Sequence, residues 1–136
     1  MIWGAMSSVC IASIYYLAKI KDIPVRLLID TGAAKSCLFK SYYDQHHRLF
    51  GPLLPTKSEL ISAADTYLNL LGDTLPLSVT TPAPHARCYH PFTVFSSHCK
   101  HYDGFLGLDL LQKLQAQVDC GQRLISFQKK NPTQSL

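Results

Sequence analysis

The sequence predicts a mainly β domain with one or two short helices. Short runs of β-branched and aromatic residues recur along the chain, and clusters of turn-forming residues separate them. Only two stretches have a pattern typical of short helices. At 136 residues, the chain is long enough for one domain with a single hydrophobic core.

The first strands are expected at residues 9–20 and 24–30, with a turn at residues 21–22 between them. Both runs are rich in Ile, Val, Leu or Tyr, which favour strands. Pro24 stands at the start of the second run, where its missing N–H group is least harmful. Residues 35–39, Lys-Ser-Cys-Leu-Phe, predict another short strand.

Two short helices are expected. The first covers residues 41–50, with Ser41 as its N-cap and a Gly-Pro pair at residues 51–52 as its end. The second belongs to residues 103–115, where a buried strand leads into a helix that begins near Leu108.

The remaining segments are expected to add strands. Residues 59–80 contain two or three strand-like pieces, broken at residues 64–65 and 72–73, which predicts a hairpin with its tip near Asp65. After a loop, residues 87–95 alternate well enough for one strand. Residues 116–128 predict a hairpin that turns at Cys120 and Gly121.

Composition and charge exclude several classes of protein. With 47% hydrophobic and 16% charged residues, the chain is typical of a globular protein rather than a disordered one. The net charge of +4 comes from scattered side chains, apart from Lys129 and Lys130, so no nucleic-acid-binding surface is indicated. No run reaches the roughly 18 apolar residues of a membrane span, and the N-terminus lacks the basic start of a signal peptide.

The cysteines indicate the compartment. Five of them, an odd number without regular spacing, favour free thiols in a reducing environment over a disulfide framework. We therefore expect a soluble, cytoplasmic protein without a cofactor. A zinc site is the alternative, because six potential ligands fall within 17 residues: His85, Cys88, His90, His98, Cys99 and His101. They do not form two pairs at finger spacing, so we expect scattered surface histidines, core cysteines and no bound metal.

Residues 25–38 contain the candidate catalytic group. A buried run ends in a carboxylate, Asp30, and small side chains follow it. Gly32 permits close backbone approach and supplies an N–H group to hold the carboxylate, and Thr31 supplies a hydroxyl that can lock the loop. The alternative is an Asp that merely caps a turn. We favour a carboxylate that activates water.

Residues 103–111, Asp-Gly-Phe-Leu-Gly-Leu-Asp-Leu-Leu, supply a second and less specific motif. Phe105 and Leu106 are suited to the floor beneath a catalytic loop, and Gly107 suits a place where another backbone passes close. A core strand that leads into a helix explains the same residues. The value of this motif lies in its position relative to Asp30.

The order and spacing of four segments resemble the retropepsin family of aspartic proteases, and most closely the protease segment of gypsy-type retrotransposon polyproteins. These segments are residues 27–38, 61–79, 103–111 and 118–127. The resemblance implies a closed, retropepsin-like β-barrel at residues 14–128. Residues 1–13 are then an N-terminal extension, and residues 129–136 are a C-terminal tail.

The resemblance implies a homodimer, because the chain has one Asp-Thr-Gly motif and is too short for a two-lobed enzyme. Each subunit supplies one Asp30. Two carboxylates about 3 Å apart cannot both ionise, so the pair shares one proton. The ionised member activates water and the protonated member polarises the scissile carbonyl. Thr31 would reach across to the partner's loop, and Gly32 would offer its carbonyl to the substrate.

Substrate contacts are implied at two places. Ala33 and Ala34 follow the motif, and Ala34 stands where viral members carry an Asp that contacts the substrate backbone. The tip of the predicted hairpin would be a flap that closes over an extended peptide. It lacks the glycines of viral flaps, and its residues are Ala63, Ala64, Asp65 and Thr66.

The expected function is therefore that of an aspartic endopeptidase that processes a retroelement polyprotein. The alternative is a catalytically silent or domesticated retropepsin-like module for dimerisation or peptide binding. The intact Asp-Thr-Gly-Ala motif at residues 30–33 favours the enzyme.

Overall fold

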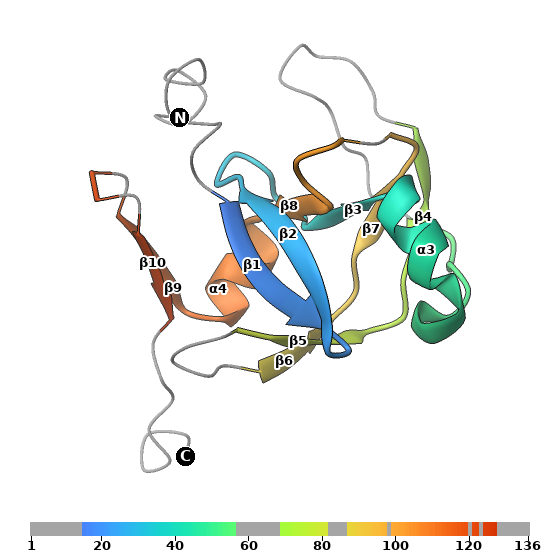
Figure 1. Cartoon of the computed structure of the whole chain (residues 1–136), viewed down its shortest axis with the longest axis horizontal. Coiled ribbons are helices and arrows are strands. Elements are labelled where there is room, and N and C mark those ends of the chain that lie inside the picture. Colours follow the sequence, from blue (N-terminus) through green and yellow to red (C-terminus); the bar gives the residue numbers. More distant parts are fainter. Residues whose placement is uncertain are drawn as a thin grey trace.

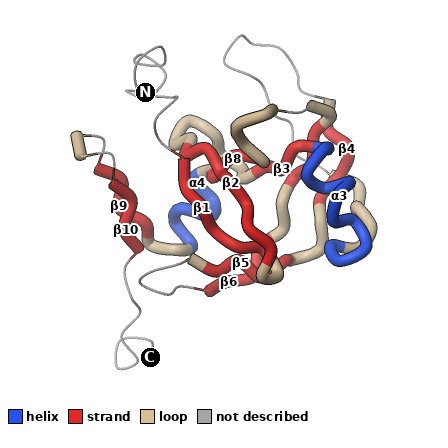
Figure 2. Tube along the Cα trace, viewed as in Figure 1, coloured by secondary structure: helices blue, strands red, loops and turns tan. Residues whose placement is uncertain are grey.

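The computed structural model describes residues 15–56, 69–81, 87–97, 99–119, 121–122 and 124–127. Over these residues the protein is mainly β, as the sequence predicts. An eight-stranded sheet curls into a half-barrel, and a separate two-stranded hairpin stands beside it, next to α4 (Figure 1). In Figure 2, strands recur along the described trace, with α3 and α4 as its helices and loops between these elements.

The strand order of the large sheet is β4-β7-β3-β8-β2-β1-β5-β6. The bounds of its strands in chain order are β1 Tyr15–Ile20, β2 Ile23–Ile29, β3 Cys37–Phe39, β4 Leu70–Asp73, β5 Leu77–Thr80, β6 Arg87–His90, β7 Thr93–Phe95 and β8 Gly104–Leu106. The hairpin consists of β9 Ala116–Asp119 and β10 Leu124–Phe127, and the helices are α3 Lys40–Phe50 and α4 Leu108–Lys113.

The β1–β2 hairpin forms where the sequence predicts it. Lys21 and Asp22 both have positive φ angles, of 49° and 68°. Two such residues make a turn whose twist matches the strands on either side. The strands pair antiparallel, from Ile20 with Ile23 at the turn towards the far end of the hairpin.

Strand β8 lies between two strands from an earlier part of the chain. It pairs parallel with β2 and antiparallel with β3. Asp103, just before β8, joins all three strands: its N–H donates to the carbonyl oxygen of Arg26 at 2.7 Å, and its carbonyl accepts from the N–H of Phe39 at 2.8 Å. Gly104 is required here, because a Cβ atom would lie 2.0 Å from the carbonyl oxygen of Cys37.

The large sheet is apolar on both faces. Leu38 and Leu106 belong to the main core, whereas Phe39, Phe95 and Phe105 form a second, aromatic cluster. The ring centroids of Phe39 and Phe95 are 4.8 Å apart. Successive strand residues point to opposite faces, so strands buried on both sides have continuous apolar sequences.

Helix α3 ends as predicted but starts differently. Gly51, with a φ angle of 82°, follows the last residue and donates its N–H to the carbonyl oxygen of His47. The prediction of Ser41 as N-cap is wrong: the helix starts at Lys40, and Phe39 holds the cap position without a side-chain bond. Strand β3 runs directly into the helix, which leaves no separate capping residue.

The prediction of one strand at residues 87–95 is also wrong. Strand β6 pairs with β5, whereas β7 pairs with β3 and β4. The break falls at Pro91, which has no N–H for a ladder. Phe92 is then held by Thr74, whose hydroxyl accepts from the Phe92 N–H at 2.9 Å and whose N–H donates to the Phe92 carbonyl at 2.8 Å.

The predicted break at residues 72–73 is confirmed, because β4 ends at Asp73 and the next strand, β5, starts at Leu77. Gly72 also lies at a bulge: the register of β4 against β7 shifts between Leu70 and Gly72, and Gly72 has a φ angle of 148°. The predicted hairpin tip near Asp65 lies outside the described residues.

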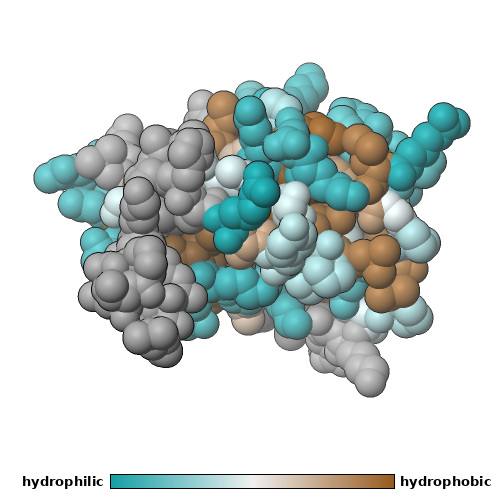
Figure 3. All heavy atoms as spheres, turned by 90° about the horizontal axis from the view of Figure 1, so that it is seen from below, coloured by the Kyte–Doolittle hydropathy of each residue, from teal (hydrophilic) through white to brown (hydrophobic). Residues whose placement is uncertain are grey.

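The edge strands of the large sheet are β4 and β6, and they do not pair with each other. Closure of the barrel therefore stays a prediction. No helix among the described residues is long and apolar enough to cross a membrane. On the face seen in Figure 3, hydrophobic areas are interspersed with hydrophilic ones. Within the described ranges, the large hydrophobic residues that stay exposed are Leu17, Leu49, Leu54, Leu71, Leu75, Tyr89 and Leu108.

Candidate active site

Asp30 follows the last residue of β2, at the point where the parallel pairing with β8 ends. Ile29 pairs with Leu106, and the N–H of Asp30 donates to the carbonyl oxygen of Leu106 at 3.0 Å. The sheet therefore fixes the backbone of Asp30. The residue is half-buried, whereas Gly32 and Ala34 after it are exposed. The backbone that carries the Asp30 carboxylate is therefore held in place, and the residue remains accessible to solvent.

The turn after β2 folds back onto Asp30. The N–H of Gly32 donates to Oδ1 of Asp30 at 3.0 Å, and the N–H of Ala33 donates to the Asp30 carbonyl oxygen at 3.1 Å. Hydrogen bonds to a carboxylate are stronger than bonds between neutral groups. Gly32 thus holds the carboxylate in one orientation, as its position in the sequence predicts. Thr31 lies half-buried within the turn.

The start of α4 holds this turn in place through backbone hydrogen bonds. The N–H of Leu108 donates to the carbonyl oxygen of Ala33 at 2.8 Å, and the N–H of Asp109 donates to that of Ala34 at 3.2 Å. The first N–H groups of a helix have no partner within the helix. Here they bind the loop, so the predicted substrate-binding residues Ala33 and Ala34 are fixed through their backbones.

Gly107 lies where the two backbones are closest. A Cβ atom on Gly107 would be 2.6 Å from the carbonyl oxygen of Lys35 and 2.9 Å from that of Ala33. Of the three residues predicted as a floor, Leu106 and Gly107 lie directly under the loop. The Phe105 ring instead packs in the aromatic cluster, with its centroid 5.5 Å from that of Phe39.

A network of polar side chains lies behind the loop, buried at Ser36 and His90 and half-buried at Asp109. We call Ser36, Asp109 and His90 the relay. The Ser36 hydroxyl accepts from the N–H of Gly107 at 2.9 Å and donates to Oδ1 of Asp109 at 2.7 Å. Oδ2 of Asp109 bonds to Nε2 of His90 at 2.8 Å, and Nδ1 of His90 bonds to Nζ of Lys113 at 2.9 Å.

The relay was not predicted from the sequence. Its members come from three segments, and Ser36 and Asp109 are 73 residues apart. The one local signal was a Ser immediately before an apolar strand, since a buried hydroxyl needs a partner. Ser36 is 1% exposed and His90 is 6% exposed.

Two side chains near the loop have shifted pKa values. Burial raises the pKa of Asp109, but hydrogen bonds from His90 and Ser36 outweigh it and hold that pKa below its ordinary value. Burial, and then the negative charges of Asp109 and Asp30, raise the pKa of the Cys37 thiol to about 12. Cys37 is therefore an uncharged core residue and not a nucleophile.

Other predicted site residues lie elsewhere. The predicted flap residues Ala63, Ala64, Asp65 and Thr66 are outside the described part of the chain. So are two of the potential zinc ligands, His85 and His98. Among the residues that the structure describes, no group of three His, Cys, Asp or Glu side chains is arranged to hold a metal.

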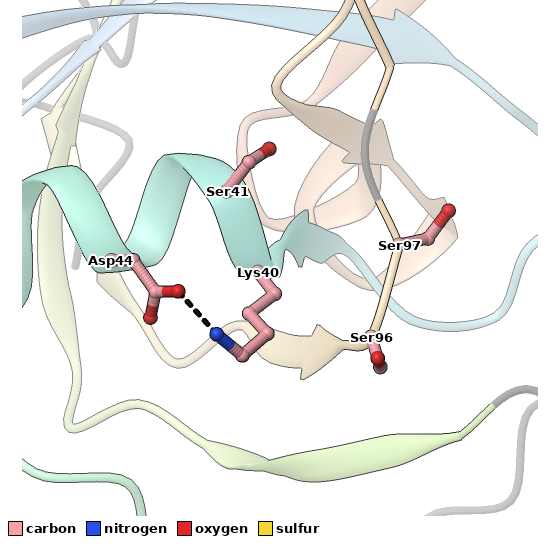
Figure 4. Close-up of a pocket in the computed structure, with 5 residues that line it drawn as sticks. All are labelled: Lys40, Ser41, Asp44, Ser96 and Ser97. Atoms are coloured by element: carbon pink, nitrogen blue, oxygen red, sulfur yellow. Dashed lines mark hydrogen bonds and ion pairs between the residues drawn. The ribbon is translucent and has the colours of Figure 1, made fainter.

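A surface hollow beside α3 takes no part in this site. Figure 4 shows Lys40 and Asp44 one helical turn apart, joined by an ion pair, and two serines on the segment after β7. No residue of the Asp30 loop lines this hollow. Its lining residues are Lys40, Ser41, Asp44, Ser96 and Ser97.

The loop presents one oriented carboxylate with small neighbours, which leave room for a chain to approach its backbone. A single carboxylate can act as a general base or, when protonated, as a general acid. It cannot do both for the same reaction at the same moment. In the described part of the loop, this carboxylate is that of Asp30.

Comparisons with known proteins agree with this architecture. No family model matches the sequence, and no curated protein does either. Among solved structures, the retroviral protease-like domain of Ddi1 from Leishmania major is similar with a TM-score of 0.62 and 18% identity, over 91% of this chain and 98% of that one. EIAV protease complexed with the inhibitor HBY-793 is similar with a TM-score of 0.58 and 23% identity, over 77% of this chain and 90% of that one.

A retropepsin-like aspartic protease from Rickettsia conorii is similar with a TM-score of 0.50 and 18% identity, over 77% of this chain and 75% of that one. Identities this low show the fold and not the activity. The three proteins share the overall fold of this chain. The chain therefore has the retropepsin-like fold of aspartic proteases.

Proposed function

We propose that this chain is an aspartic endopeptidase whose active unit is a homodimer with one Asp30 from each subunit. One observation carries the proposal: in a retropepsin-like fold, Asp30 sits on an accessible loop that Leu106, Gly107 and the start of α4 hold in place. A surface Asp without a role needs no such support. The same residues keep the carboxylate in one position, which is what catalysis by positioning requires.

The proposed reaction needs both carboxylates. Two of them about 3 Å apart share one proton. The ionised member takes a proton from water as the water oxygen bonds to the peptide carbonyl carbon, and the protonated member donates a hydrogen bond to the carbonyl oxygen. The tetrahedral intermediate then collapses. The C–N bond breaks, the carbonyl double bond forms again, and the leaving nitrogen takes the proton that the first carboxylate received from water. Because the pair must hold one proton, the rate plotted against pH should be bell-shaped, with an acidic optimum.

Two surface features support assembly of two chains. Leu108 is 38% exposed, although it directly follows Gly107 and its N–H bonds to the catalytic loop. The β9–β10 hairpin pairs only within itself among the described strands, which leaves its edges open to strands of another chain. In this proposal the second carboxylate comes from the second chain.

The substrate in this proposal is an extended peptide that lies as an added strand between the catalytic loop and the flap at residues 63–66. A retroelement polyprotein of the gypsy type is the substrate that the sequence resemblance favours. The described cysteines, Cys37, Cys88 and Cys99, are free thiols. Free thiols support the cytoplasm as the compartment.

The test compares the full chain with Asp30→Asn on a mixed peptide library between about pH 4 and pH 7, where such dyads work. Asn keeps the volume of Asp but cannot take a proton from water, so we expect cleavage by the parent only. Pepstatin should inhibit it, and EDTA should not. Equal cleavage by both proteins would exclude the aspartic mechanism. A folded dimer of the parent that binds peptides without cleaving them would favour the silent module instead.

A further inference from the structure

We propose that His90, on the edge strand β6, is a positioning residue for the catalytic loop and acts through Asp109 and Ser36. The inference rests on the proposed function, because it concerns the loop that carries Asp30. His90 makes no described bond to residues 30–35, so its effect must pass through the relay.

The first link joins the loop to the start of α4. Ser36 directly follows the loop, and its hydroxyl accepts the N–H of Gly107, the residue before α4. Gly107 is buried, and an unpaired N–H there would cost free energy. The next two N–H groups, of Leu108 and Asp109, bind loop carbonyls. Ser36 therefore fixes the distance between the loop and the helix that supports it.

The second link orients the Ser36 hydroxyl. Its hydrogen is donated to Oδ1 of Asp109, which leaves an oxygen lone pair free to accept from Gly107. Oδ1 of Asp109 also accepts the N–H of Leu110 at 2.7 Å. If the Asp109 carboxylate rotated, both bonds would be lost together. The orientation of this carboxylate therefore decides whether Ser36 can hold Gly107.

The third link fixes that carboxylate. Lys113 donates to Nδ1 of His90 and to the carbonyl oxygen of Tyr89. With Nδ1 as acceptor, the hydrogen of a neutral His90 ring lies on Nε2 and points at Oδ2 of Asp109. The His90 ring also packs edge-on against Phe92, with centroids 5.8 Å apart. His90 is thus held on both sides and presents one N–H to Asp109.

The experiment removes this N–H without emptying the site. His90→Phe keeps a ring but has no donor, and His90→Gln keeps an N–H donor in a side chain of similar reach. Ser36→Ala, which deletes only one oxygen, is a second route to the same effect if His90→Phe does not fold. Tyr42→Phe is the matched control, because it deletes the hydroxyl of another buried residue, which donates to the carbonyl oxygen of Pro24 and contacts neither the loop nor His90.

Amide hydrogen exchange in the full chain gives a result that does not depend on activity. We expect His90→Phe and Ser36→Ala to speed exchange at Leu108 and Asp109 about tenfold, as local opening becomes easier. The N–H of Lys21, bonded to the Ser78 carbonyl at 2.9 Å, should exchange as in the parent. His90→Gln should restore slow exchange at least in part. Unchanged exchange in both variants, or the same change in Tyr42→Phe, would overturn the proposal.

Kinetics then separate this inference from the proposed function. In an active parent, His90→Phe should lower kcat roughly 10- to 100-fold with little change in KM, because a slightly misplaced catalytic group slows the chemical step. A fall in stability alone, with kcat kept in the folded fraction, would reduce His90 to a structural role. If the parent shows no cleavage, the proposed function fails, and the exchange rates still decide whether His90 positions the loop.

Discussion

At the scale of single residues, the ionisation of Asp109 should make the stability of the folded chain depend on pH. Its pKa is lower in the folded chain than its ordinary value of 3.8, because the hydrogen bonds from His90 and Ser36 outweigh burial. Such a carboxyl adds stability above its unfolded pKa and loses that stability as the pH falls through its folded pKa. Asp109→Asn should therefore be less stable than the parent near neutral pH, and the difference should shrink below about pH 3.8.

Urea unfolding of both proteins from about pH 6 down to about pH 3 measures this difference. Asp44→Asn is the control, because the exposed pair of Asp44 with Lys40 should contribute little at any pH. A destabilisation by Asp109→Asn that stays the same throughout this range would contradict the prediction.

Single residues also show what the sequence could and could not predict about the site. Asp30, Gly32 and Gly107 could be recognised because the residue type itself carries the signal: the charge of an Asp or the missing side chain of a Gly. The roles of His90 and Asp109 depend on a contact across 19 residues between a strand and a helix. The sequence around His90, a short strand with polar residues, is typical of a surface position. Only the tertiary fold shows that it is buried.

At the scale of elements, the contact of the catalytic loop with α4 depends on Gly107. The Cβ of Gly107→Ala would meet backbone atoms of Lys35 at 2.6 Å, and backbone cannot move aside as a flexible side chain can. We expect a loss of about 1–3 kcal/mol in the free energy of unfolding, and a larger loss of activity. Gly121→Ala is the control, because its Cβ would lie 3.4 Å from Oδ1 of Asp119. Equal effects in urea unfolding would argue against a close loop–helix contact.

The β9–β10 hairpin gives a second prediction at this scale. Ala116, Val118 and Ile125 pack against the main core, but the backbone of the hairpin bonds only within itself among the described strands. In the proposed dimer these strands join the subunits. Deletion of all residues after Gln122 should give an inactive monomer, whereas deletion of residues 129–136 should leave assembly unchanged. Sedimentation and peptide cleavage test both, and an active dimer of the shorter chain would exclude this role.

Elements were predictable where neighbours in sequence are neighbours in space. The β1–β2 hairpin, β3, α4 and the β9–β10 hairpin follow from local patterns. The split of residues 87–95 has one local signal, Pro91, but both halves favour strands, and their different partners, β5 and β3, come from the tertiary fold. Likewise, the cap of α3 is Phe39 because β3 ends there, whereas residue preferences alone favour Ser41.

For the whole molecule, the central prediction is that activity belongs to pairs of chains. Parent protein mixed with an equal amount of Asp30→Asn should form hybrid dimers with one carboxylate, so activity per parent chain should fall to about half after exchange of subunits. Specific activity should also fall on dilution. Asp44→Asn, mixed in the same way, is the control and should not lower the activity of the parent. Constant activity per parent chain in both mixtures would mean that one chain suffices.

The insertion of β8 between β2 and β3 has a consequence for synthesis. Arg26 and Asp103 are bonded across 77 residues, and Asp30 meets its support only at Leu106 and Gly107. Contacts over such separations form late, because a long loop must close first. On the ribosome, the Asp30 loop is made early but stays without its support until residue 107 has emerged. A nascent chain therefore cannot assemble the proposed cleavage site while the first three-quarters of the domain are being translated, and it is protected from its own activity until the fold is nearly complete.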